Sequence, residues 1–231
     1  MYRRITALLW LRTQILKSNV NILIQVILPY AMLIMYKFVM KPEGMANRYI
    51  MFLCLSMAIA MSVGLTISII IAEEKEKKNL KTLMLSGVKT SEYIISTIAY
   101  PIFFAILVTI AFPLTADVDL SGMYIQYTTV VLLTCLATIL IYLCIAGISD
   151  TQSKAQVNSL PIMFIIALGP MFSQLNKSIG TFIQYTFLGA FNELTNGKFN
   201  FSNTSFVILL IWIIILFALT SFTIKTSKKI K

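Results

Sequence analysis

Six long apolar segments constrain what this chain can fold into more than any other feature of its sequence. They are separated by short polar stretches, except before the last one, and they cover 20–38, 49–72, 93–116, 124–149, 157–172 and 204–224. A helix that crosses a lipid bilayer needs roughly 20 consecutive apolar residues. The pattern therefore predicts an all-α membrane protein with six transmembrane helices, forming a single transmembrane domain over residues 1–231.

The composition supports this prediction and excludes a single soluble globular domain. Of the 231 residues, 58% are apolar and 12% are charged, whereas soluble domains average about 45–50% and 25%. The chain has no histidine and no phosphate-binding pattern GxxxxGK[ST], and its three cysteines stand singly within apolar stretches. We therefore expect no catalytic residue, no metal site and no cofactor bound by this chain, so that any ATP that powers it is bound by another chain.

The distribution of positive charge predicts how the chain is oriented in the membrane. With both termini in the cytosol, fourteen of the 19 Lys and Arg residues fall on the inner side and five on the outer side. An excess of Lys and Arg marks the cytosolic loops of membrane proteins. We expect a multi-pass protein of the cell membrane with cytosolic N- and C-termini, and the net charge of +10 then reflects topology and not a nucleic-acid partner.

Residues 1–19 have the pattern of an amphipathic helix. Their apolar residues fall on one helical face, at Ile5, Leu8, Leu9, Ile15 and Leu16, while most basic residues lie off that face. Such a helix is typical of a segment that lies in the membrane interface. The pattern predicts an interfacial helix on the inner leaflet, with an ordinary basic lead-in to the first span as the alternative.

A mixed charge run follows the second apolar segment. Glu73 and Glu74 come directly after Ala72, and because a charged residue in mid-bilayer costs roughly 2.5–3.5 kcal/mol, they mark the membrane surface. The run continues as Lys75, Glu76 and Lys77, so the helix could extend from the bilayer into water.

A short helix with an apolar strip is predicted next, within the cytosolic loop 73–92. Leu80, Leu83 and Met84 repeat at helical spacing, and Ser86-Gly87 predicts the end of the helix. The strip could lie on lipid headgroups or insert into a groove of a soluble partner.

The second span carries a stripe of small residues at four-residue spacing, formed by Ser56, Ala60, Gly64, Ser68 and Ala72. Small residues at this spacing let two membrane helices approach closely. The stripe could serve close packing within the chain, or a dimer seam or substrate path. Ser62 and Thr66 flank it and could contact cargo.

Residues 173–203 predict a helix at the outer face. Apolar residues recur at helical spacing from Ile179 to Leu194, and Asn196-Gly197 offers a stop. Such a helix would lie in, or dip into, the outer leaflet. Because the predicted spans hold no chain of carboxylates, a proton- or sodium-coupled carrier is not expected, and the energy source is left to a partner.

The charge run, the leucine-bearing helix, the Ser-Gly break and the aromatic start of the next span at Tyr93 resemble the ABC-2 family of ATP-binding-cassette transporter permeases. The resemblance covers the whole chain. Two positions depart from the family pattern, which often has glycine at Asn79 and proline near Gly87.

The resemblance implies that the 73–92 loop holds a coupling helix docked into an ABC ATPase subunit, which binds ATP and Mg. Its ATPase-coupling residues would be Glu73, Glu74, Glu76, Lys77, Leu80, Leu83 and Met84. It also implies a re-entrant or gate element over 173–203, with a plain interfacial anchor as the alternative. The gate residues would be Pro170, Phe182, Tyr185, Phe187 and Phe191.

We therefore expect a permease subunit that pairs with a second, identical copy in the lipid bilayer. It would export an amphipathic or hydrophobic substrate such as a peptide, lipid or drug. The small size and the lack of a large outer domain also resemble the permeases of peptide-toxin exporters of the phenol-soluble modulin type. The alternative is a six-span scaffold or immunity protein that sequesters a partner and transports nothing.

Overall fold

The computed structural model describes residues 2–40 and 46–229, which form helices and no strand. In chain order these are α1 (Tyr2–Ser18), α2 (Val20–Ile34), the π-helix η1 (Met35–Met40), α3 (Asn47–Ala58), the π-helix η2 (Ile59–Leu65), α4 (Thr66–Glu76), α5 (Asn79–Leu85), α6 (Thr90–Ala116), α7 (Tyr124–Ile148), α8 (Gln152–Leu175), α9 (Lys177–Gln184), α10 (Gly189–Thr195) and α11 (Thr204–Lys229). The expected all-α class is confirmed.

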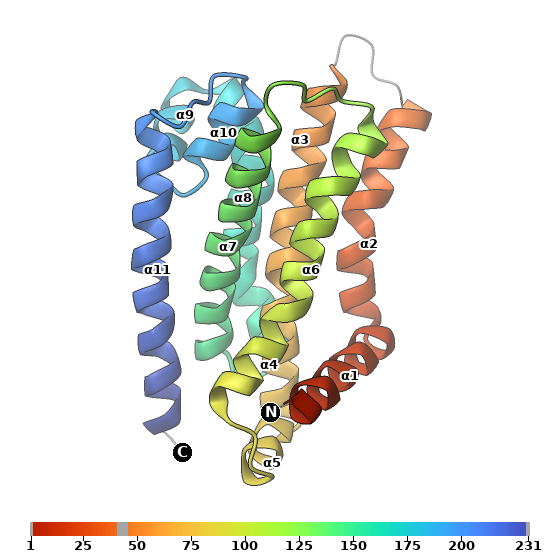
Figure 1. The fold of residues 1–231 in the computed structure, drawn as a ribbon, viewed down its shortest axis with the longest axis vertical. Coiled ribbons are helices and arrows are strands. Elements are labelled where there is room, and N and C mark those ends of the chain that lie inside the picture. Colours follow the sequence, from red (N-terminus) through yellow and green to blue (C-terminus); the bar gives the residue numbers. More distant parts are fainter. Residues whose placement is uncertain (1, 41–45, 230–231) are drawn as a thin grey trace.

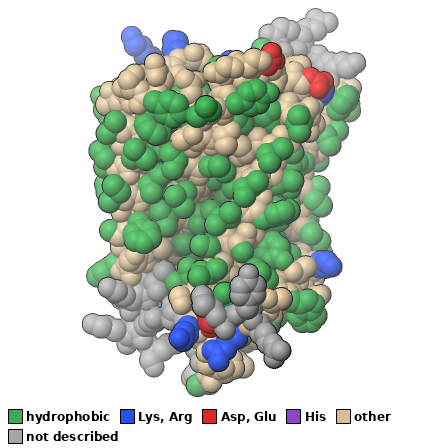
Figure 2. All heavy atoms as spheres, viewed as in Figure 1, with side chains coloured by type: hydrophobic (Ala, Val, Ile, Leu, Met, Phe, Trp, Pro, Cys, Tyr) green, Lys and Arg blue, Asp and Glu red, His purple; other side chains and the backbone are tan. Residues whose placement is uncertain are grey.

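Six helices in this part of the chain are long and apolar enough to cross a membrane. They cover Val20–Met40, Asn47–Glu76, Ser91–Ala116, Tyr124–Ile148, Gln152–Leu175 and Thr204–Thr223. Figure 1 shows them side by side in one bundle, with α1 and α5 at one end and α9 and α10 at the other. We call these the α5 end and the α9–α10 end. On the face that Figure 2 shows, apolar side chains cover the middle of the bundle and charged ones lie near its two ends.

The second span lies at the centre of the bundle. It runs without a break through α3, η2 and α4, and 83% of its most apolar stretch is buried, against 17% for the last span. The difference follows from the side chains, because the second span carries small and hydroxyl residues that neighbouring helices can approach closely. Span two therefore contacts most of the other helices, whereas α11 leaves most of its surface free for lipid or another protein.

The small-residue stripe packs within the chain. Ser56 donates a hydrogen bond to the carbonyl oxygen of Ala167 on α8 at 2.8 Å, and the Ser68 and Ser159 hydroxyls lie 3.2 Å apart. At Gly64 an added Cβ would lie 2.4 Å from a ring carbon of Tyr142 on α7. Glycine is needed here because a larger residue would have to displace a fully buried tyrosine ring.

The π-helical segment η2 was not anticipated from the sequence. It occupies Ile59–Leu65, around the middle of span two. Ser62 and Thr66, which flank the small-residue stripe, are fully buried within the chain. Each donates to a backbone carbonyl, Ser62 to that of Gln25 at 3.2 Å and Thr66 to that of Ser62 at 2.9 Å. The Ser62 hydroxyl thus links span two to α2, whereas the Thr66 hydroxyl bonds within span two.

The segment after α8 forms two helices where the sequence indicated one. The chain turns at residues 185–188, between α9 and α10. The Thr186 hydroxyl accepts a hydrogen bond from the Leu188 N–H at 3.2 Å, which favours a turn over a helix. Gly189 allows the turn to close, because a Cβ there would lie 2.4 Å from the carbonyl oxygen of Gln184. Apolar periodicity continues across the turn, which is why it did not reveal the break.

Candidate functional site

A buried cluster of polar side chains joins three helices at the α5 end. Arg12 of α1 donates to the Glu74 carboxylate of α4 through Nη1, and to the Thr97 hydroxyl of α6 through Nη2 at 2.7 Å. The Tyr93 hydroxyl donates to the other Glu74 oxygen at 2.6 Å, and the guanidinium lies 5.0 Å from the centre of the Tyr93 ring. We call these four residues the Arg12–Glu74 cluster.

The two charged side chains of this cluster are buried, so their hydrogen-bond partners must lie in defined positions. Arg12 is 0% exposed and Glu74 is 1% exposed, so both charges have left water. Desolvation of an ion pair is costly unless partners hydrogen-bond to it in good geometry. Tyr93 and Thr97 supply such partners from α6, and the cluster therefore holds α1, α4 and α6 in one arrangement.

The neighbouring charges of span two anchor it to further helices. Lys75 donates to the carbonyl oxygens of Ala146 and Gly147 at the end of α7, at 2.6 and 2.8 Å. Glu76 accepts from the backbone N–H of Gln152 at the start of α8, at 2.8 Å. Each charge suits the helix end that it contacts, because a helix C-terminus attracts cations and an N-terminus attracts anions.

Glu73 completes this set of anchors. Its carboxylate accepts from the Asn19 side chain at 2.7 Å and pairs with Lys77 at 2.6 Å. The residues predicted for ATPase coupling, Glu73, Glu74, Glu76 and Lys77, thus all contact side chains or backbone of their own chain. Glu74 has no surface for a soluble partner, so any role of Glu74 in coupling acts through Arg12 and Tyr93.

The short helix α5 projects beyond these contacts. The structure confirms the predicted Ser-Gly break, because α5 ends at Leu85 and Gly87 has a φ of 85°. Leu83 is half-buried and Leu85, which was not singled out, is 80% exposed. The side chains of Leu80 and Met84, which complete the predicted apolar strip, lie outside the described residues.

Helix α1 reaches the turn that follows α5. Arg4 donates to the carbonyl oxygen of Gly87 at 2.9 Å and lies 3.9 Å from the Glu92 carboxylate. The α5 helix is therefore connected to α4 on one side and to α1 on the other.

Sequence reasoning missed the role of Arg12. Arg12 is one of the fourteen Lys and Arg residues assigned to the inner side, and the helical pattern placed the apolar face of residues 1–19 at Ile5, Leu8, Leu9, Ile15 and Leu16. In the structure the buried face is formed by Leu8, Arg12 and Leu16, four residues apart. The four-residue spacing could have indicated this role, because an arginine between two buried leucines on one helical face needs a hydrogen-bonding or charged partner.

The predicted gate residues fall into two sets at the α9–α10 end. Pro170, Phe187 and Phe191 are buried, and the Phe191 ring packs edge-on against Phe52 with centroids 5.7 Å apart. Phe182 and Tyr185 on the α9 side are each 66% exposed. Arg48, at the start of α3, donates to the carbonyl oxygen of Leu194 at 3.0 Å, which links span two to the end of α10.

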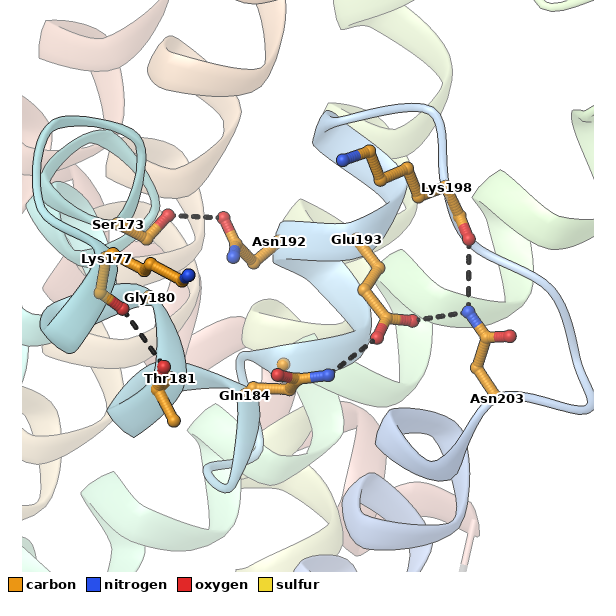
Figure 3. Close-up of a pocket in the computed structure, with 10 residues that line it drawn as sticks. Ser173, Lys177, Gly180, Thr181, Gln184, Asn192, Glu193, Lys198 and Asn203 are labelled. Carbon is orange, nitrogen blue, oxygen red and sulfur yellow. Dashed lines mark hydrogen bonds between the residues drawn. The ribbon is translucent and has the colours of Figure 1, made fainter.

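A polar cavity lies at the same end. It has a volume of about 370 Å³ and is lined by Ser173, Lys177, Gly180, Thr181, Gln184, Gly189, Asn192, Glu193, Lys198 and Asn203. Figure 3 shows Lys177 and Lys198 approaching it from two sides, with the Glu193 carboxylate hydrogen-bonded to Gln184 and Asn203. None of these residues was predicted, because they are polar residues scattered between apolar positions.

Within the described residues, no group of three or more His, Cys, Asp and Glu side chains could hold a metal ion. Cys54 and Cys135 are buried and Cys144 is half-buried, all as free thiols.

The chain matches a family model described as ABC-2 family transporter protein over residues 5–222. No curated protein and no solved structure matches the chain significantly.

Proposed function

The chain belongs to the ABC-2 family of transporter proteins, and from this premise we propose that it is the permease subunit of an exporter whose ATP is hydrolysed by a separate ATPase subunit. The α5 end faces the cytosol, with both termini on that side. Two copies of the chain pair in the membrane, and cargo passes along the seam between them.

The observation that carries the coupling mechanism is the set of anchors at the end of span two. Residues Glu73 to Glu76 contact α1, α6, α7 and α8 directly. The helix α5 follows them after the short turn at Lys77-Lys78. A push on α5 by the ATPase therefore moves the end of α4, and with it four other helices. Because these contacts include buried charges with defined geometry, a movement of α4 is passed to the neighbouring helices with little loss.

Span two carries this displacement toward the opposite end. Ser68 and Ser56 tie it to α8, and Arg48 ties it to the carbonyl of Leu194 at the end of α10. The π-helix η2 lies between these contacts. Single π-helical turns inside α-helices occur frequently at functional sites, and η2 is the place where the two halves of span two can change their relative orientation.

The apolar character of the membrane helices supports an amphipathic or hydrophobic cargo such as a peptide, lipid or drug. Only 22% of the most apolar stretch of Val20–Met40 and 17% of that of Thr204–Thr223 is buried. These faces leave apolar surface for lipid, for a second copy of the chain and for cargo between two copies.

The coupling assignment is tested by substituting the leucines of α5 in the complex purified from native membranes. We expect Leu83→Asp with Leu85→Asp to reduce the copurifying ATPase at least about tenfold and to abolish transport, because a carboxylate in an apolar groove is strongly disfavoured. Asn79→Asp with Thr82→Asp is the matched control, since it adds the same two negative charges at exposed positions of α5 without removing a leucine.

Retention of both ATPase and transport by the leucine variant would overturn the docking assignment. A complex that retains the ATPase, yet shows no stimulation of ATP hydrolysis by any amphiphile supplied, would instead identify the chain as a scaffold.

A further inference from the structure

The polar cavity at the α9–α10 end has no part in the coupling mechanism, and its lining carries an excess of positive charge. Lys177 and Lys198 line it, and neither forms an ion pair with any described residue. Glu193 is the one carboxylate among the lining residues. Its two oxygens already accept hydrogen bonds from Ser205 and Asn203.

Helix α9 separates this cavity from the apolar surface of the protein. Residues 177, 180, 181 and 184 line the cavity, which is the spacing of one helical face. Phe182 and Tyr185, which do not line it, are each 66% exposed. The helix thus presents a polar face to the cavity and aromatic side chains to its surroundings.

The aromatic residues indicate the level of the cavity in the bilayer. The Trp212 indole N–H on α11 donates to the carbonyl oxygen of Tyr185 at 3.0 Å, which places Trp212 beside the α9 aromatics. Tryptophan and tyrosine gather at the membrane–water interface, at the depth of the lipid headgroups. A cavity just behind such residues is within reach of a lipid phosphate, while the acyl chains of that lipid stay outside against α9.

We propose that this cavity binds the phosphate-bearing headgroup of an anionic membrane lipid between Lys177 and Lys198. The lysine ammonium groups neutralise the phosphate, and the hydroxyl and amide groups of Ser173, Asn192 and Gln184 provide further hydrogen-bonding partners at the wall. The volume of about 370 Å³ is in the range of small-ligand sites. The proposal requires only that the chain is in a membrane, and not that it couples to an ATPase.

The test uses the full chain in nanodiscs of phosphatidylcholine with a small fraction of phosphatidylglycerol, with bound lipids counted by native mass spectrometry. We expect the wild-type protein to retain phosphatidylglycerol over phosphatidylcholine. Lys177→Gln with Lys198→Gln should reduce this preference at least about tenfold, because it removes both ammonium groups that line the cavity. Lys17→Gln with Lys154→Gln is the matched control, since it removes two exposed lysines at the other end and should leave the preference unchanged.

Glu193→Gln should change the preference for phosphatidylglycerol in the opposite direction. Removing the one carboxylate of the lining raises the positive charge of the cavity, so retention of phosphatidylglycerol should increase.

A loss of preference in the control variant as large as in the cavity variant would overturn the proposal. It would also be overturned if inorganic phosphate bound in phosphatidylcholine nanodiscs and no lipid preference were found, because the site would then recognise a free anion. Since transport is not measured, failure here leaves the proposed coupling at α5 untouched.

Discussion

The two ends of the bundle use charged residues in opposite ways. At the α5 end Arg12 and Glu74 are buried and bonded to each other, to Tyr93 and to Thr97. At the α9–α10 end Lys177 and Lys198 line an open cavity without an ion-pair partner among the described residues. Charges of the first kind hold helices in position, and charges of the second kind remain available to a ligand.

The difference arises from what covers each end. Helix α1 packs against α6, and its Arg12 reaches Glu74 near the end of α4, so that both side chains are buried together with their partners. At the opposite end α9 and α10 are short and separated by a turn, so they leave space between them and the start of α11. A buried charge without a partner is costly, whereas a hydrated one is not. The buried charges at the α5 end therefore need an ion-pair partner, whereas the hydrated lysines at the α9–α10 end do not.

The largest expected effect comes from breaking the buried pair. Arg12→Ala leaves Glu74 buried without its cation and should lower the free energy of unfolding by about 3–5 kcal/mol, measured by denaturant titration in detergent micelles. The double variant Arg12→Met with Glu74→Leu should recover most of this loss, because an apolar pair of similar volume is often as stable as the ion pair.

A loss below about 1 kcal/mol in Arg12→Ala would show that the cluster does not hold the helices together. If the double variant is stable but has lost transport, the charges serve coupling and not stability alone.

An intermediate effect is expected at the other end, where Glu193 is half-buried. It accepts from Ser205 and from Asn203, which precede or begin α11. Glu193→Gln keeps one acceptor oxygen and should lower the free energy of unfolding by about 1–2 kcal/mol. Gln184→Ala, which removes only the long 3.5 Å contact to Glu193, is the control and should change stability by less than about 0.5 kcal/mol. Equal losses for Glu193→Gln and Arg12→Ala would contradict the contrast between the two ends.

The smallest effect on the free energy of unfolding is expected for an exposed ion pair at the α5 end, and it shows whether burial or position decides the contribution of a charge. Asp150 and Lys154 lie at the α5 end, 3.8 Å apart, with both side chains exposed. Asp150→Asn should change the free energy of unfolding by less than about 0.5 kcal/mol, and added salt should not alter that result, because exposed pairs contribute little. A large loss on the same titration would mean that position at the α5 end matters more than burial.

Several features of the fold followed from local sequence alone. The Ser86-Gly87 break, for example, depends on residues that are adjacent in the chain. The break at Thr186 and the π-helix at Ile59–Leu65 could not be predicted in this way, because apolar periodicity is unchanged across both. The roles of Arg12 and Arg48 could not be predicted either, since their partners Glu74 and Leu194 are far away in sequence.

The sequence by itself determined that this chain is a six-span helical membrane protein and that a short leucine-bearing helix follows the second span. Length, apolarity and turn residues act locally, so they can be read along the chain. Only the tertiary structure decided which charges are buried and which remain open to a ligand. That choice depends on helices such as α1 and α4, whose side chains Arg12 and Glu74 are 62 residues apart and meet only when the bundle has packed.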